Sequence, residues 1–275
     1  MKKGTVWVLG ASSGLGLATA QAFAASGWLV IGGARSFECR DLDREDKLGF
    51  ICLPLDVTNE ESCDRFVRQA FEWSEQVDIL VSCAAMLMLG SCEMTSTDEY
   101  TRIMETNFIG TVRMVQMVLP HMRKKRNGKI ILFSSINGLL GIPFQSAYTA
   151  SKHAIEGFAE CLAMEVKPFG IGVCVVEPGD HSGGSTHTRL HANAESDTSP
   201  YSAAYQAATK VIGKDEAKGL SPDKLGAKVV RNAERRHMRF RLRVAKLDQH
   251  AAVWMHDVLL PSINAMILRQ YYGAK

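Results

Sequence analysis

Residues 5–16 read Thr-Val-Trp-Val-Leu-Gly-Ala-Ser-Ser-Gly-Leu-Gly, and they are typical of a strand, a glycine turn and the start of a helix. A short run of β-branched and apolar residues predicts a buried strand. Apolar residues then recur at helical spacing over 17–24, and Gly27 is a natural helix end. Between strand and helix, Gly10, Gly14 and Gly16 leave room for backbone N–H groups to approach a pyrophosphate. The stretch therefore predicts a dinucleotide site, with a plain glycine turn as the alternative.

The rest of the chain repeats the alternation of strands and helices. This rhythm predicts one doubly wound Rossmann domain over residues 1–275, with about seven mostly parallel strands and helices on both faces. A polar, glycine-containing segment at about 180–220 is a candidate lid, and about 238–275 is a C-terminal extension. Strands are expected at 5–10, 28–35, 50–57, 77–85, 128–135, 172–179 and 239–244, and helices at 59–75, 97–126, 145–163, 200–212 and 221–237.

Composition excludes several classes of protein. The chain has 275 residues, 46% of them hydrophobic and 22% charged, as in an ordinary globular protein. A net charge of +3 does not imply nucleic acid, and no apolar run reaches membrane-spanning length. No export signal is evident, so we expect a cytoplasmic protein. Seven cysteines, an odd count without a CxxC pair, indicate reduced thiols and no metal site.

Two residues at strand ends bear on the nucleotide. An arginine after the second strand can pair with a 2′-phosphate, whereas an acidic residue there would bind a ribose hydroxyl. The sequence has Arg35, followed by Ser36, which favours NADP(H) over NAD(H). A surface arginine is the alternative. Asp56 ends the third strand, where it could accept from an adenine amino group or cap the next helix at Thr58/Asn59.

Tyr148 and Lys152 lie four residues apart in an expected helix, so their side chains share one face. A free tyrosine titrates near pH ~10, and a neighbouring cation lowers that pKa. The pair could therefore act as a general acid or base, although an ordinary surface pair would give the same spacing. Asn107 stands inside the expected helix 97–126, where a poor helix former predicts a kink or a buried polar role.

Gly10-Ala-Ser-Ser-Gly-Leu-Gly, Asn107, Ser135, Tyr148-x-x-x-Lys152 and Pro178-Gly179 occur in an order that resembles the short-chain dehydrogenase/reductase family. The resemblance runs from about residue 4 to 180. Residues such as Phe144, the run after Tyr148 and 239–244 are also similar to its 17β-hydroxysteroid and retinol dehydrogenase-like branch.

This resemblance implies roles for particular residues. Tyr148 would exchange a proton with the substrate oxygen, Ser135 would hydrogen-bond the same oxygen, and Lys152 would lower the pKa of Tyr148. Asn107 would hold a water that links Lys152 to solvent. Cofactor binding is implied for Gly10, Ser12, Ser13, Gly14, Leu15, Gly16, Arg35, Ser36, Asp56, Val57, Cys83, Ala84, Ala85, Tyr148, Lys152, Pro178 and Gly179.

Three positions depart from the family pattern. Leu9 replaces a threonine, which removes a hydrogen bond to the chain after the fourth strand. Ser82-Cys-Ala-Ala85 replaces the usual Asn-Asn-Ala-Gly. Gly183 stands where a threonine would hold the nicotinamide carboxamide, and Ser182, Ser185 or Thr186 could substitute for it.

The segments 86–89 and 139–144 are apolar and would wall the substrate pocket. They suit a hydrophobic alcohol or ketone, although they could equally be core. We expect an NADP(H)-dependent hydroxysteroid dehydrogenase; a reductase for a retinoid, long-chain or other small carbonyl is the alternative. A non-catalytic NADP-binding sensor is the alternative from another class, and nucleic acid is not expected as a partner. The family resemblance also implies a homodimer or homotetramer.

Overall fold

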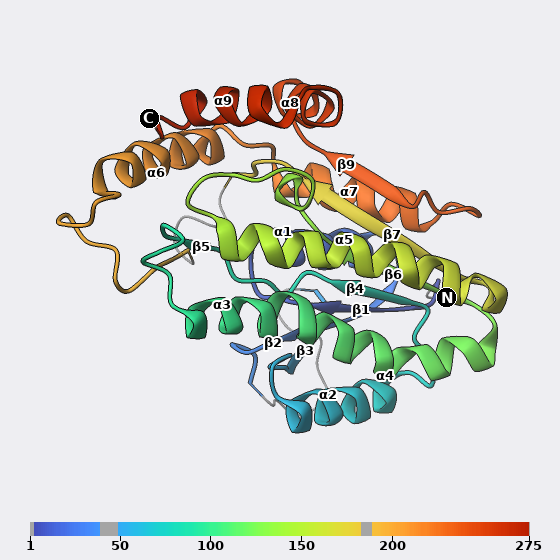
Figure 1. Ribbon diagram of the computed structural model, residues 1–275. Coiled ribbons are helices and arrows are strands. Elements are labelled where there is room, and N and C mark those ends of the chain that lie inside the picture. Colours follow the sequence, from blue (N-terminus) through green and yellow to red (C-terminus); the bar gives the residue numbers. More distant parts are fainter. Residues whose placement is uncertain (1–2, 39–48, 183–188, 275) are drawn as a thin grey trace.

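The computed structural model describes residues 3–38, 49–182 and 189–274, and it contains a seven-stranded parallel sheet in the order β3-β2-β1-β4-β6-β7-β9 (Figure 1). The chain moves outward from β1 to β3 and then returns to the other side of β1 with β4. The carboxyl ends of β1 and β4 therefore flank the switch point where such sheets bind ligands. The strands are β1 Thr5–Leu9, β2 Leu29–Ala34, β3 Ile51–Pro54, β4 Ile79–Ser82, β6 Gly128–Phe133, β7 Ile171–Pro178 and β9 Arg241–Val244.

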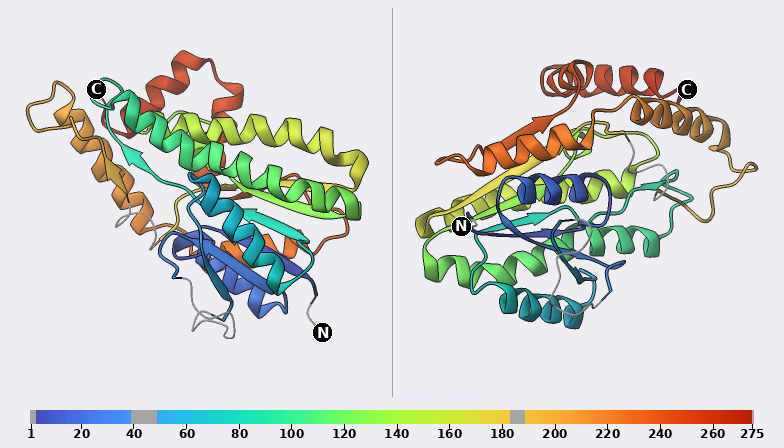
Figure 2. Two further views of the ribbon diagram at one scale, coloured as in Figure 1. Left: turned by 90° about the horizontal axis from the view of Figure 1, so that it is seen from below. Right: turned by 180° about the vertical axis from the view of Figure 1, so that it is seen from behind.

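Helices cover both faces of the sheet (Figure 2), because alternate residues of each buried strand point to opposite sides. Val6 and Val8 contribute to a core with α1 and α7, whereas Trp7 and Leu9 contribute to a second core with α2, α4 and α5. The predicted Rossmann architecture is thereby confirmed. The helices of these two layers are α1 Gly14–Ala25 and α7 Pro222–Ala233, and α2 Glu60–Trp73, α4 Gly110–Lys125 and α5 Ser146–Val166.

The helix expected at 97–126 runs as α3 (Thr97–Met104), a π-helical turn (Glu105–Ile109) and α4. Ser96 begins it with a capping box, in which Glu99 reciprocates. Asn107 lies inside the π-helical turn with an exposed fraction of only 1%. A mid-helix asparagine therefore marks both an irregular turn and a buried polar site, as its poor helix propensity predicted.

The C-terminal third adds elements that pattern reasoning only partly anticipated. The segment 180–220 contains β8 (Leu190–His191), which pairs with β5 (Met88–Leu89), and α6 (Ser202–Ala217). Beyond β9, α8 (Leu247–Val258) and α9 (Pro261–Tyr271) form a pair above the sheet that the sequence did not suggest (Figure 1). None of the helices within the described residues is long and apolar enough to cross a bilayer.

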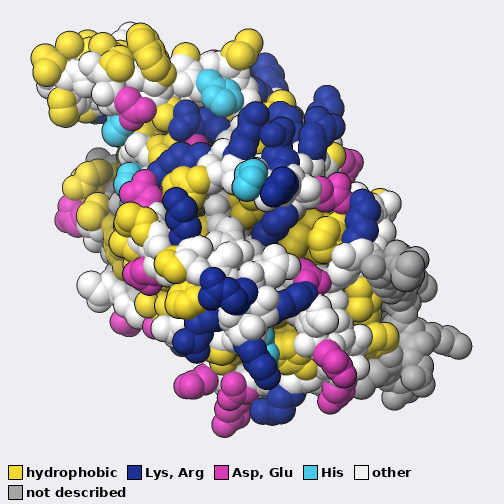
Figure 3. Space-filling view, turned by 90° about the vertical axis from the view of Figure 1, so that its right-hand side faces the viewer, with side chains coloured by type: hydrophobic (Ala, Val, Ile, Leu, Met, Phe, Trp, Pro, Cys, Tyr) yellow, Lys and Arg dark blue, Asp and Glu magenta, His cyan; other side chains and the backbone are white. Residues whose placement is uncertain are grey.

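Exposed apolar side chains concentrate on α8 and α9. Trp254 has an exposed fraction of 64% and Leu260 one of 67%. Figure 3 shows this pair as an apolar protrusion at the top, beside a face crowded with Lys and Arg. The opposite side of α8 buries Val253 against Ile136 and its neighbours in the loop after β6. The C-terminal pair is thus anchored to that loop.

The basic stripe of β9 is largely neutralised within the protein. Arg241 pairs with Glu177 and Glu156 at 2.7 and 2.5 Å, and Arg243 pairs with Glu177 at 2.7 Å. Glu177 is fully buried, so these contacts tie β9 to β7 and α5. Side chains used in this way are poorly available to phosphate groups.

Candidate active site

A cleft of about 570 Å³ lies at the carboxyl edge of the sheet. Its volume falls in the range of small-molecule sites. It is lined by every residue that the sequence analysis assigned to the cofactor and by Ser135, but Asn107 does not line it. The predicted residues thus converge from seven separate segments: Gly10–Gly16, Arg35–Ser36, Asp56–Val57, Cys83–Ala85, Ser135, Tyr148–Lys152 and Pro178–Gly179.

One end of the cleft is built from the turn between β1 and α1. Gly10 has a φ of +81°, and a Cβ there would lie 2.7 Å from the backbone nitrogen of Ala84. A Cβ on Gly16 would lie 2.1 Å from the carbonyl oxygen of Gly10. The side chain of Ser13 does not cap α1, and the first turn of α1 has no acidic residue. An uncapped helix N-terminus that opens into the cleft fits the phosphates of a dinucleotide.

Arg35 and Ser36 follow β2 and line the same end of the cleft. Both are exposed, so the guanidinium is accessible to an anion from solvent. Asp56 accepts from the backbone nitrogen of Thr58 at 3.0 Å and from its hydroxyl at 2.7 Å. The helix cap of α2 is instead Asn59, which accepts from the nitrogen of Ser62. Asp56 therefore shapes the turn after β3 and still faces the cleft.

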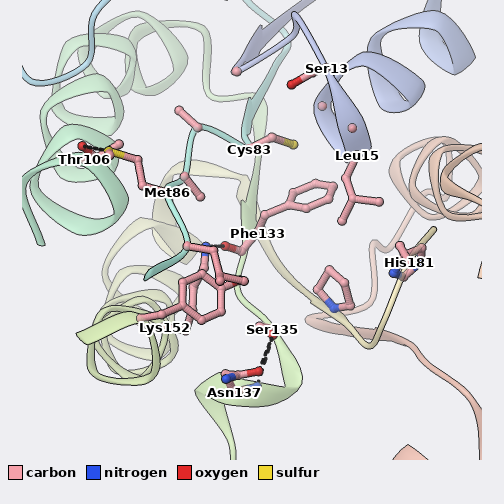
Figure 4. A pocket seen from close by; sticks show the side chains of 18 of the residues that line it. Ser13, Leu15, Cys83, Met86, Thr106, Phe133, Ser135, Asn137, Lys152 and His181 are labelled. Atoms are coloured by element: carbon pink, nitrogen blue, oxygen red, sulfur yellow. Dashed lines mark hydrogen bonds between the residues drawn. The ribbon is translucent and has the colours of Figure 1, made fainter. Parts of the chain in front are cut away.

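Tyr148, Lys152 and Ser135 all line the cleft. Figure 4 shows Lys152 and Ser135 among the residues around it. Lys152 reaches from α5 toward β6, where its ammonium donates to the carbonyl of Phe133 at 2.8 Å. The ammonium lies 5.5 Å from the centre of the Tyr148 ring. The Ser135 hydroxyl lies close enough to Tyr148 to lower the pKa of its phenol, whereas the Ser134 hydroxyl contacts backbone carbonyls. The geometry thus places a phenol, a hydroxyl and an ammonium together.

The expected lowering of the Tyr148 pKa is wrong, because burial outweighs it. Burial raises the pKa of Tyr148 to about 12, with Ser135 lowering it and Glu216 raising it to a smaller extent. Burial also lowers the pKa of Lys152 to about 8. Desolvation disfavours both charged forms and outweighs the attraction between them. The resting site therefore holds a neutral phenol, which is the form that donates a proton.

Asn107 lies beneath the cleft and joins two of its walls. Its carboxamide oxygen accepts from the backbone nitrogen of Met86 at 2.7 Å. Its nitrogen donates to the carbonyl of Met86 and to the hydroxyl of Ser151, both at 2.9 Å. Both N–H groups are thus used to hold the loop after β4 against α5. The water-binding role implied by the family resemblance stays a prediction.

Sequence reasoning missed a polar network next to Ser135. Asn137 donates its backbone N–H to the Ser135 hydroxyl at 3.2 Å. The Asn137 side chain donates to Gln145 at 3.0 Å and to Thr149 at 3.3 Å. Asn137 and Gln145 also line the cleft. Their proximity in sequence to Ser135 and Tyr148 was the only available signal, because Asn and Gln are frequent in ordinary loops.

A second missed group is acidic. Asp180, Asp215 and Glu216 line the cleft from the segments after β7 and at the end of α6. Arg189 pairs with Glu216, and both side chains are nearly buried. Burial, with smaller contributions from Asp215 and Glu216, raises the pKa of Asp180 to about 6. This end of the cleft therefore carries negative charge, which no local motif reveals because the residues are far apart in sequence.

The departures from the family pattern have visible consequences. The backbone nitrogen of Cys83 donates to the carbonyl of Leu9 at 3.0 Å, so the chain after β4 stays tied to β1 without a threonine side chain. Cys83, Ala84 and Ala85 line the cleft. Ser182 also lines it. Gly183, Ser185 and Thr186 lie outside the described residues.

A model of the short-chain dehydrogenase family matches residues 4–196 of this chain. The Rossmann fold and the residues of the cleft agree with that match. The chain belongs to the short-chain dehydrogenase family and is an oxidoreductase of that family. Over its whole length it is 39% identical to the 3-ketodihydrosphingosine reductase of Bacteroides thetaiotaomicron, and the match covers 100% of each chain. It is 32% identical to dehydrogenase/reductase SDR family member 7B of Xenopus laevis, over 98% of this chain and 81% of that protein.

Solved structures give the same fold. A short-chain dehydrogenase from Streptomyces avermitilis superposes with a TM-score of 0.84 at 29% identity, with 100% of each chain covered. An alcohol dehydrogenase from Thermococcus sibiricus, complexed with 5-hydroxy-NADP, superposes with a TM-score of 0.68 at 22% identity. That match covers 88% of this chain and 96% of the other. At that identity the second match bears on the fold alone.

Proposed function

We propose that the protein is an NADPH-dependent reductase of a long-chain amino ketone, with 3-ketodihydrosphingosine as the substrate. The observation that carries the proposal is the 39% identity, end to end, with a reductase named for that compound. The hydroxysteroid favoured by the apolar loops 86–89 and 139–144 is the competing substrate. Both are hydrophobic, so the apolar wall alone does not separate them.

The charge of the cleft supports the amino ketone. 3-Ketodihydrosphingosine carries an amino group on the carbon next to its ketone, and a steroid carries no cation. Asp180, Asp215 and Glu216 supply three carboxylates at this end of the cleft, and Glu216 is close enough to Tyr148 to raise its pKa. Opposite charges attract strongly where water is partly excluded. A carbonyl oxygen at Tyr148 would thus place a neighbouring ammonium group near these acids.

The chain's own residues supply the proton chemistry of a ketone reduction. A bound nicotinamide would supply the hydride. The Tyr148 hydroxyl donates a proton to the carbonyl oxygen, and the Ser135 hydroxyl donates a hydrogen bond to the same oxygen. The Lys152 ammonium stabilises the phenolate that remains on Tyr148. These interactions strengthen as negative charge develops, so they favour the transition state over the ground state.

A substrate panel with NADPH tests the function. We expect turnover of 3-ketodihydrosphingosine and little turnover of 3-keto or 17-keto steroids. Asp180→Asn should raise KM about tenfold for the amino ketone, a loss of roughly 1.4 kcal/mol in binding, and leave KM for a neutral long-chain ketone unchanged. Efficient steroid reduction without turnover of the amino ketone would contradict the proposal.

The preference for NADPH is a separate proposal that depends on Arg35. A guanidinium that forks onto a 2′-phosphate contributes charge-assisted hydrogen bonds worth roughly 1.5–3 kcal/mol. Arg35→Asp should therefore raise the Kd of NADPH by about 10- to 100-fold and change that of NADH little. Fluorescence titration of both nucleotides measures this. Equal losses for the two would mean that Arg35 does not contact the 2′-phosphate.

Tyr148→Phe distinguishes the enzyme from a nucleotide sensor. An enzyme should lose turnover by several orders of magnitude and still bind NADPH, because the phenol is replaced and the phosphate end is untouched. A sensor would have no ketone reduction to lose. We also propose, from the family resemblance and the sequence, a cytoplasmic location, a substrate lid at about 180–220, of which 183–188 lie outside the described residues, and a homodimer or homotetramer. Sedimentation of the purified chain tests the last.

A further inference from the structure

Glu156 continues the face of α5 that carries the reactive pair. Tyr148, Lys152 and Glu156 are spaced four residues apart, so their side chains follow one another along the helix. Lys152 and Glu156 have exposed fractions of 3% and 7%. A carboxylate that is buried one turn from a buried ammonium has little water to screen it.

The carboxylate of Glu156 is only half used by the ion cluster behind it. Its Oε2 accepts from Arg241 at 2.5 Å, whereas its Oε1 is buried without a hydrogen-bond partner within the part of the chain that the structure describes. Arg241 also binds Glu177 on β7 and Glu160 on α5, at 2.7 and 2.6 Å. Arg243 binds Glu177 as well.

The charges of this cluster do not cancel. Three carboxylates, Glu156, Glu160 and Glu177, face two guanidinium groups, Arg241 and Arg243. One negative charge is therefore left over, and Lys152 is the buried cation on the same helix face. The formal charges of these five side chains sum to zero only when the positive charge of Lys152 is added to them.

Two groups oppose the loss of the proton from Lys152, namely Cys83 and Glu156. A thiol opposes it only as a thiolate. Burial raises the pKa of Cys83 well above its ordinary value, so this side chain is neutral at neutral pH. Tyr148 is also neutral there, because its pKa is about 12. Burial raises the pKa of Glu156 as well, but Arg241 opposes this rise. The Glu156 carboxylate, one turn away on the same helix face, is therefore the group that can place negative charge beside Lys152.

We propose that Glu156 is a positioning residue of the active site, which holds Lys152 in its ammonium form through the carboxylate one helical turn away. Glu156 does not contact substrate or cofactor in this arrangement, and it acts through Lys152. The ammonium in turn stabilises the phenolate that Tyr148 leaves after proton donation. The proposal depends on the dehydrogenase chemistry of the family and not on which ketone is reduced.

Glu156→Gln tests the proposal, because it keeps the shape and an acceptor for Arg241 but removes the charge. In lysine-13C-labelled protein, we expect the Cε resonance of Lys152 to titrate about one pH unit lower than in the unsubstituted protein. Lys152→Met assigns the resonance by its disappearance. This titration needs no substrate, so its outcome is distinct from failure of the amino-ketone proposal. The alkaline limb of kcat/KM against pH should shift by the same amount for any ketone that is turned over.

Glu160→Gln is the matched control. Glu160 also pairs with Arg241, but its side chain is 57% exposed, so its loss should leave the Lys152 titration unchanged. Glu156→Asp keeps the charge and should titrate close to the unsubstituted protein. Glu156→Asp serves as the test if Glu156→Gln does not fold. If the Lys152 midpoint moved by a full pH unit in Glu156→Asp, where the charge is retained, the proposal would be overturned. The proposal also fails if Glu156→Gln folds and leaves the Lys152 midpoint in place.

Discussion

Lys152 and Tyr148 lie one turn apart on α5, and burial shifts their pKa values in opposite directions. The sequence predicted the pair from its spacing alone, and the structure confirms that both side chains face the cleft. It could not predict the sign of the Tyr148 shift, because desolvation depends on what the rest of the chain packs around the hydroxyl. The site therefore keeps the proton on Tyr148 and holds a cation of lowered pKa beside it.

The first prediction concerns the cost of burying Lys152. Its pKa is about 8 in the folded protein and 10.5 in the unfolded chain. Below pH 8 the folded state therefore bears the full penalty, about 3 kcal/mol, and stability rises as pH increases from 8 to 10.5. Lys152→Met should remove this penalty, partly offset by about 1 kcal/mol for the lost donor to Phe133.

Urea unfolding measures the difference. At pH 7 we expect Lys152→Met to abolish ketone reduction and to be more stable by about 1–2 kcal/mol, as functional residues often oppose stability. The advantage should shrink as pH approaches 10. A variant that is less stable at pH 7, with no change in the difference toward pH 10, would contradict the assignment of a penalty to this ammonium.

At the scale of elements, the helix formed by α3, the π-helical turn and α4 shows where pattern reasoning succeeds. The apolar periodicity predicted where this helix begins and ends. The poor helix propensity of Asn107 predicted an irregular turn inside it. The pattern did not predict that the first residue of α4, Gly110, packs closely against Val57. Gly110 lies so near the turn after β3 that a Cβ would be 2.6 Å from Cγ2 of Val57. Helix propensity alone would favour alanine there.

The second prediction contrasts two helical glycines. Gly110→Ala should destabilise the protein by roughly 1–3 kcal/mol, because the new methyl overlaps Val57 and outweighs the gain in helix propensity. It should also weaken nucleotide binding, since Val57 lines the cleft. In α5, a Cβ on Gly157 would meet nothing within 4 Å. Gly157→Ala should therefore stabilise by about 0.5–1 kcal/mol. Thermal unfolding of the two variants checks this, and the same sign for both would refute it.

For the whole molecule, the parallel sheet brings residues from distant segments to one edge. Alternation of strands and helices was enough to predict this arrangement, because parallel strands need helical crossovers. The end of the chain was not predicted beyond its being an extension. α8 nevertheless bears on the site, since Val253 packs on Ile136, and Ser135 precedes that residue.

The third prediction tests this anchoring. Val253 has an exposed fraction of 1%, and its neighbour Trp254 has one of 64%. Val253→Ala should cost roughly 1–2 kcal/mol, which lowers Tm by about 2–4 °C per kcal/mol, and should reduce kcat through the loop that carries Ser135. Trp254→Ala removes a larger side chain, but that side chain is exposed, so Tm and kcat should change little. Equal effects of the two would mean that α8 does not support the site.

The sequence by itself determined the order of the strands along the chain, the glycine turn and the Tyr148–Lys152 pair, because each depends on spacing within a dozen residues. Contacts between distant segments bring Asp180, Asp215 and Glu216 into the same cleft as Tyr148, and they join Glu156 through Arg241 of β9 to Glu177 of β7. These features depend on contacts between distant segments and on the exclusion of water, and a linear pattern records neither.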